Sequence, residues 1–139
     1  MPATVLAFLV VGAGGAAGAM ARFGLTMATL RFSNVIPIGT LVSNLAGCLI
    51  MGAIVQMLAR LAWFAEGGVI TDHNRLLFGV GFCGAFTTLS ALVLEISTML
   101  QRDQIALAFV YLTTTLVGGF ACFYAGCAIV RSITAAQGG

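Results

Sequence analysis

The sequence has very little charge: Asp, Glu, Lys and Arg together make up 7% of its 139 residues. It has no lysine, and its six arginines and four acidic residues give a net charge of +2. Soluble domains carry about 25% charged residues, so this chain lacks the polar surface of a soluble enzyme or a soluble nucleic-acid-binding domain. It also lacks a basic tract that would bind a phosphate backbone. We therefore expect no nucleic-acid partner.

Long apolar stretches take the place of the missing charge, and hydrophobic residues make up 60% of the chain. Four stretches each reach the ~20 residues that a helix needs to cross the hydrocarbon core of a bilayer. They run from Ala3 to Leu30, Ile36 to Ala62, Leu76 to Leu100 and Ile105 to Val130. None alternates as the strands of a β-barrel do. The sequence predicts an all-α membrane protein, with a single four-helix transmembrane domain over residues 1–139 in contact with lipid.

The arginines are divided equally between the two sides of the predicted membrane. One side holds Arg60, Arg75 and Arg131, and the other holds Arg22, Arg31 and Arg102. An excess of Lys and Arg in the cytoplasmic loops normally sets the orientation of a membrane protein. Equal numbers give no preference and favour insertion in both orientations, hence an antiparallel dimer, although six residues also balance by chance.

The third stretch is the least helix-like. Its centre contains three glycines and three hydroxyl residues, namely Gly79, Gly81, Gly84, Thr87, Thr88 and Ser90. Each glycine costs up to ~1 kcal/mol relative to alanine within a helix. Broken helices inside a membrane expose carbonyl oxygens and amide N–H groups that bind ions. A break is favoured here, and a continuous helix with a small-residue packing face is the alternative.

Several polar side chains inside the stretches have two interpretations. Asn44 is either a hydrogen-bonding link between helices or a donor to a permeating anion. Arg22 either extends to the interface or holds positive potential at an anion's entrance. Glu95 is the only acid within a stretch, so it needs a partner or an aqueous path. Tyr111 and Thr115 share a helix face, and the threonine hydroxyl either bonds to its own backbone or lines a pore.

Close helix packing is the better interpretation of Gly14, Gly15, Gly18 and Ala19, because small residues at i, i+4 let helix backbones approach each other. The four cysteines show no metal-ligand spacing. No nucleophile–base pair or phosphate-binding loop occurs in any stretch, so an enzyme is not expected.

Three motifs follow in order along the chain: Gly14-Gly15-x-x-Gly18-Ala19-x-x-Arg22, Gly39-Thr40-Leu41-x-x-Asn44-x-x-Gly47 and Gly81-Phe82-Cys83-Gly84-x-x-Thr87-Thr88-x-Ser90. With the chain length, the four spans and the balanced arginines, they resemble the CrcB/Fluc family of fluoride channels. The resemblance covers essentially the whole chain.

The resemblance implies an antiparallel, dual-topology homodimer in the cell (inner) membrane that exports fluoride passively and lowers its cytoplasmic concentration. It implies a structural Na⁺ ion at the dimer centre, held by the main-chain carbonyls of Gly84 and Thr87. It also implies a fluoride pore, to which we assign Arg22, Thr40, Asn44, Leu89, Ser90, Leu92, Glu95, Tyr111 and Thr115.

The chain also departs from the family pattern. The family usually has two pore-facing phenylalanines where this chain has Leu89 and Leu92, and a serine is common where it has Gly119. A phenyl ring presents a positive edge to an anion, which leucine does not. The pore is therefore altered, and two alternatives stay open: a weakly conducting subunit that needs a paralogous partner, and a small multidrug-type proton antiporter. Such antiporters place their essential acid in the first span, whereas Glu95 is in the third.

Overall fold

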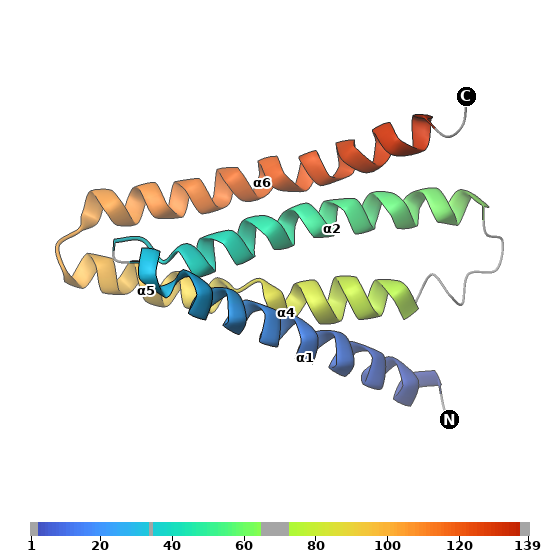
Figure 1. Cartoon of the computed structure of the whole chain (residues 1–139), viewed down its shortest axis with the longest axis horizontal. Coiled ribbons are helices and arrows are strands. Elements are labelled where there is room, and N and C mark those ends of the chain that lie inside the picture. The colour runs from blue at the N-terminus through green and yellow to red at the C-terminus, as the bar shows by residue number, and fades with distance from the viewer. Residues whose placement is uncertain (1–2, 34, 65–72, 137–139) are drawn as a thin grey trace.

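The computed structural model describes residues 3–33, 35–64 and 73–136, without the side chains of residues 60–64. Its elements are α1 (Ala3–Thr29), η1 (Leu30–Phe32), α2 (Ile38–Phe64), η2 (Arg75–Cys83), α4 (Gly84–Phe86), α5 (Leu89–Gln101) and α6 (Ile105–Ala136). They form an elongated bundle in which the start of α1 and the end of α6 lie at the same end (Figure 1). Every described element is helical, as the sequence predicts.

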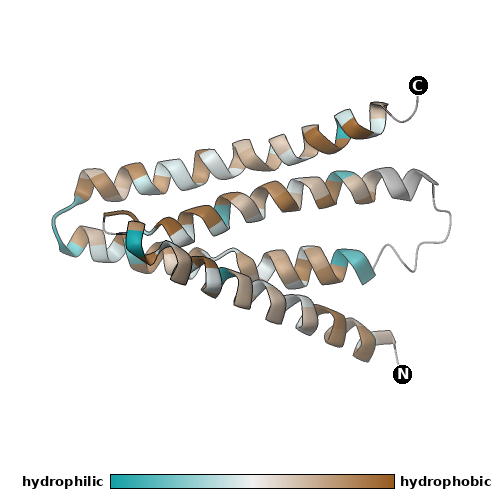
Figure 2. Cartoon of the chain, viewed as in Figure 1, coloured by the Kyte–Doolittle hydropathy of each residue, from teal (hydrophilic) through white to brown (hydrophobic). Residues whose placement is uncertain are grey.

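Four of these segments are long and apolar enough to cross a membrane, namely Ala3–Phe32, Ile38–Ala59, Arg75–Gln101 and Ile105–Ala136. They coincide with the four predicted stretches to within a few residues at most ends. Figure 2 shows that apolar residues cover the helices along their length, and that polar residues gather at the tight turn between α5 and α6. Asp103 makes this turn with a positive φ of 57°.

Close backbone contacts fix two pairs of helices. A Cβ atom added to Gly14 or Gly18 of α1 would collide with the carbonyl oxygens of Leu77 and Phe82, respectively. In the same way, a Cβ on Gly52 of α2 would collide with the carbonyl oxygen of Phe123 in α6. Small residues allow such contacts in membrane helices. The prediction of close packing is confirmed at Gly14 and Gly18, whereas a Cβ on Gly15 would lie at an ordinary 3.9 Å from the Gly81 carbonyl oxygen.

The third span is broken, as predicted, and the break lies at Thr87 and Thr88. Both residues are extended, with φ/ψ of −85°/156° at Thr87 and −153°/120° at Thr88. The part before the break contains a feature that the sequence analysis did not predict, because η2 is a π-helix. After the break, the Thr88 hydroxyl accepts a hydrogen bond from the Ala91 N–H and caps α5.

Candidate functional site

The break is held together by one side chain from α2. The Nδ2 atom of Asn44 donates to the Thr88 carbonyl at 3.2 Å, and its Oδ1 accepts from the Thr88 N–H at 2.8 Å. The side-chain oxygen of Asn44 thus replaces the helical partner that the Thr88 N–H loses. A buried backbone group without a partner costs about 1–3 kcal/mol. Asn44 is therefore a link between helices, and one of its two Nδ2 hydrogens remains for another acceptor.

Two carbonyl groups just before the break also accept from side chains. The Cys83 carbonyl accepts from both the N–H and the hydroxyl of Thr87, at 3.0 and 2.9 Å. The Ala85 carbonyl accepts from Nε of Arg22 at 3.2 Å. Arg22 therefore does more than extend to the interface: its guanidinium lies at the C-terminal end of a helical segment, where positive charge is favourable.

The Gly84 carbonyl differs from its two neighbours. In a continuous helix it would accept from the Thr88 N–H, which here donates to Asn44 instead. Gly84 is exposed, and nothing lies within 4 Å of where its Cβ would be. Within the described residues, no group of three or more His, Cys, Asp or Glu side chains is placed to hold a metal ion. Carbonyl oxygens suit hard cations, and the Gly84 carbonyl is one that the Thr88 N–H does not occupy.

Glu95 has the partners that its position inside a span requires. Its Oε1 accepts from the Thr40 hydroxyl at 2.6 Å, and its Oε2 accepts from the Tyr111 hydroxyl at 2.7 Å. Thr40 and Tyr111 are buried, and Glu95 is half-buried. The carboxylate thereby joins α2, α5 and α6. It also lines a hollow of about 310 Å³ at the end of the bundle near the α5–α6 turn, together with Arg102.

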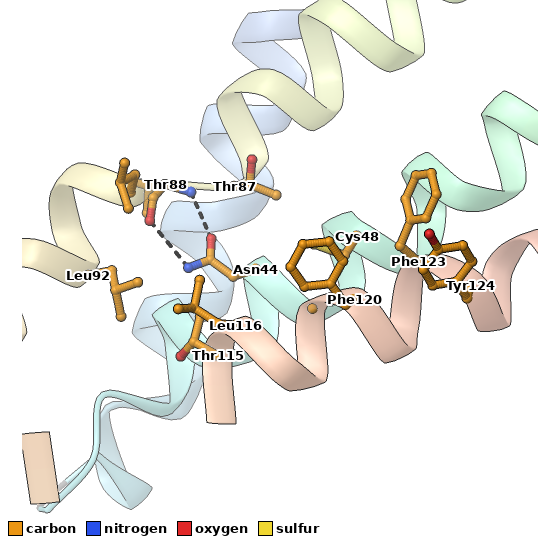
Figure 3. A pocket seen from close by; sticks show the side chains of 12 residues that line it. Asn44, Cys48, Thr87, Thr88, Leu92, Thr115, Leu116, Phe120, Phe123 and Tyr124 are labelled. Carbon is orange, nitrogen blue, oxygen red and sulfur yellow. Dashed lines mark hydrogen bonds between the residues drawn. The ribbon is translucent and has the colours of Figure 1, made fainter. Parts of the chain in front are cut away.

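A larger groove of about 470 Å³ begins at the break. Its lining residues are Asn44, Cys48, Thr87, Thr88, Leu89, Leu92, Thr115, Leu116, Gly119, Phe120, Phe123 and Tyr124. Figure 3 shows the Asn44 amide facing Thr88 at one end of the groove, and Phe123 and Tyr124 toward the other. The Thr115 hydroxyl donates to the Tyr111 carbonyl of its own helix at 2.8 Å. Asn44, Thr87 and Thr88 place polar groups at the end of the groove that meets the break.

The two leucines that stand in place of phenylalanines are not equivalent. Leu89 is 71% exposed, whereas Leu92 is 3% exposed. Leu92 lines the groove, but it also packs in the hydrophobic core with Met99, Ala108 and Tyr111. Only Leu89 therefore has room for a larger side chain without repacking of the core.

The predicted site residues fall into three groups. One group lines the groove and consists of Asn44, Thr87, Leu89, Leu92 and Thr115. The second group is the separate hydrogen-bonded cluster of Thr40, Glu95 and Tyr111. The third group surrounds the break: Gly84 begins α4, Arg22 donates to the Ala85 carbonyl of α4, and the exposed Ser90 has its hydroxyl 3.2 Å from that of Thr88.

Aromatic residues of α6 are the groove residues that the sequence analysis missed. Phe120 and Phe123 follow Leu116 at i+4 and i+7, which places all three on one helix face. This spacing was available in the sequence. Nothing in it indicated that this face of α6 meets the break in the third span.

Known proteins resemble this chain over most of its length. Residues 9–127 match the family described as "CrcB-like protein, Camphor Resistance (CrcB)". A protein named fluoride-specific ion channel FluC from Chlorobium phaeobacteroides (strain BS1) is 37% identical over 131 residues, which cover 94% of this chain and 98% of the relative. The FluC of Caulobacter sp. (strain K31) is 41% identical over 127 residues, with 90% and 94% covered.

A third relative, the FluC of Francisella philomiragia subsp. philomiragia, is 42% identical over 112 residues, which cover 81% of this chain and 85% of the relative. All three relatives are named as ion channels, so the prediction that this chain is not an enzyme is confirmed. Given the family match over residues 9–127 and its four candidate spans, the chain belongs to the CrcB family of membrane proteins.

Proposed function

We propose that this chain is a fluoride-selective channel of the cell membrane, which lets fluoride leave the cytoplasm passively and so lowers its concentration there. The single observation that carries the proposal is its similarity, over 94% of its length, to a protein named fluoride-specific ion channel FluC. The groove at the break supports it, because a polar end with amide and hydroxyl groups lies inside an otherwise apolar bundle.

The chemistry of the groove suits a small anion. Moving an unpaired charge into an apolar medium is very costly, so a pore must replace the water around fluoride with close donors. The free Nδ2 hydrogen of Asn44 is such a donor. The hydroxyls of Thr88 and Ser90 lie beside it and exchange a hydrogen bond, so one of their two hydrogens is available to an anion.

The Glu95 cluster has a different part in this proposal. A fixed carboxylate repels an anion, but here both of its oxygens accept from hydroxyls and the charge is shared with Thr40 and Tyr111. Arg102, which lines the same hollow, supplies positive charge near its opening. We assign Thr40, Tyr111 and Thr115 to the walls of the path, with Arg22 next to the break.

The assembly that we propose is an antiparallel, dual-topology homodimer. Three arginines on each side support it, because neither orientation is favoured by charge. Exposed Gly84, with a carbonyl that Thr88 does not occupy, fits a contact at which a second copy and a Na⁺ ion meet. The Gly84 and Thr87 carbonyls would hold the ion, which supplies positive charge that offsets repulsion among anions.

Fluoride efflux from liposomes that contain this chain alone tests the proposal, with chloride as the control anion. We expect fast efflux of fluoride and none of chloride. Absence of fluoride efflux from well-folded protein would contradict the proposal as stated. Co-reconstitution with a paralogue would then test the alternative of a subunit that conducts only with a partner.

A further inference from the structure

We propose that the aromatic contact for the permeating anion comes from α6, through Phe120, and not from the start of α5. The inference rests on the proposed function and adds to it a residue that determines selectivity. Its basis is the distribution of side chains around the groove, where α5 contributes Leu89 and Leu92 and α6 contributes Phe120, Phe123 and Tyr124.

Phe120 lies along the groove between its two ends. Figure 3 shows its ring between Asn44 at the break and the pair formed by Phe123 and Tyr124. Phe120 is 69% exposed within the chain, so its ring is not held in the core. The next residue toward the N-terminus is Gly119, which has no side chain to cover the ring on that side.

The side chains that line the groove differ in how they interact with an anion. Beyond Asn44, the groove is lined by Cys48, Gly119 and the aromatic residues of α6. Among these, an aromatic ring offers an anion a favourable contact through the positive edge of its quadrupole. A small anion that moves along the groove from the Asn44 amide toward Phe123 and Tyr124 therefore passes the Phe120 ring.

The other aromatic residues of the groove fit this role less well. Phe123 and Tyr124 lie edge to face with ring centroids 5.6 Å apart, so their rings already contact each other. Phe82 and Phe86 stack on each other at 5.4 Å and do not line the groove. Phe120 is the phenylalanine of the groove for which the structure gives no ring partner among the described residues.

The experiment compares fluoride efflux from liposomes for the unchanged protein, Phe120→Leu and Phe109→Leu. Phe109 is a matched control, because it is also in α6 and 69% exposed but does not line the groove. We expect Phe120→Leu to reduce fluoride efflux about tenfold, as the loss of one favourable contact to the ion implies, and Phe109→Leu to leave it unchanged.

A rescue variant separates loss of the ring from a change of shape. Leu89→Phe returns an aromatic ring to the groove from an exposed position on α5. We expect it to restore most of the efflux in the Phe120→Leu background. If Phe120→Leu lowers the yield of folded protein, Phe120→Met gives the same comparison with an unbranched side chain.

The outcomes separate the two proposals. If the unchanged protein conducts fluoride and Phe120→Leu conducts equally well, the proposed role of Phe120 is contradicted, but the proposed channel function is not. The same holds if Phe109→Leu lowers efflux as much as Phe120→Leu. If the unchanged protein does not conduct fluoride, the proposed function itself fails.

Discussion

The two halves of the third span are held in the bundle by different means. Before the break, η2 packs against α1 through glycines, so that backbone touches backbone at Gly14 and Gly18. After the break, α5 is held by the directional hydrogen bonds of Glu95 to α2 and α6. Steric contact fixes where the first half lies, whereas hydrogen bonds fix how the second half is turned about its axis. A substitution that adds an atom should therefore be most damaging in the first half, and one that removes a hydrogen bond should be most damaging in the second half.

The largest effect is expected from a methyl group at the glycine contact. Gly14→Ala places a Cβ against the Leu77 carbonyl, which is backbone and has no rotamer with which to move away. We expect the free energy of unfolding in detergent to fall by about 3 kcal/mol. Gly12→Ala is the matched control, because nothing lies within 4 Å of its Cβ in the same helix. Equal stability of the two variants would show that α1 and η2 separate easily.

A smaller loss of stability, of about 2 kcal/mol, is expected when the amide at the break becomes an acid. Asn44→Asp removes the donor to the Thr88 carbonyl and sets a carboxylate oxygen against it. The added negative charge should also suppress fluoride efflux. The control is Gln56→Glu, which makes the same exchange of an amide for a carboxylate in α2. Its side chain lies at an exposed contact with Arg131, where a carboxylate is favourable. Unchanged fluoride flux in Asn44→Asp would remove Asn44 from the pore.

Removal of one bond from the Glu95 cluster should cost less. Tyr111→Phe keeps the buried ring and deletes the hydroxyl that donates to Glu95, with an expected loss of about 1.5 kcal/mol measured by thermal unfolding. Tyr124→Phe, on the exposed surface of the same helix, is the control and should have no effect on stability. A neutral result for Tyr111→Phe would mean that packing alone orients α5.

The smallest effect is expected at Arg22. Arg22→Met keeps a long apolar side chain and loses the bond to the Ala85 carbonyl, so unfolding should become easier by no more than about 1 kcal/mol. Substitution of the exposed Arg31 by methionine controls for the loss of charge on the same side. If Arg22→Met were as damaging as Gly14→Ala, the polar contacts around the break would be as important as the steric ones.

The sequence was sufficient to predict the regular parts of this protein. Length and hydropathy predict the four spans, and the glycine and hydroxyl content around Gly84 and Thr87 predicts the break. The spacing of Gly14 and Gly18 predicts close packing. Each of these features depends on residues near one another in the chain, so a local pattern carries the information.

The contacts across the break could not be predicted in the same way. The bond from Asn44 to Thr88 joins residues 44 positions apart, and that from Arg22 to Ala85 joins residues 63 apart. The sequence indicates that Glu95 needs a partner or an aqueous path, but it does not identify Thr40 and Tyr111 as the partners. It also does not distinguish Leu89 from Leu92, because only the packing of α5 shows that one is exposed and the other buried.

The position of Asn44 has a consequence for the order of synthesis. The ribosome makes α1 and α2 before the third span, so Arg22 and Asn44 already exist when Thr87 and Thr88 emerge. An unwound segment would be unfavourable in lipid by itself, because its backbone would find no partner. Here the partners precede the segment that needs them. A nascent chain that stops after α5 already contains every residue that holds the break, and α6 then closes the groove.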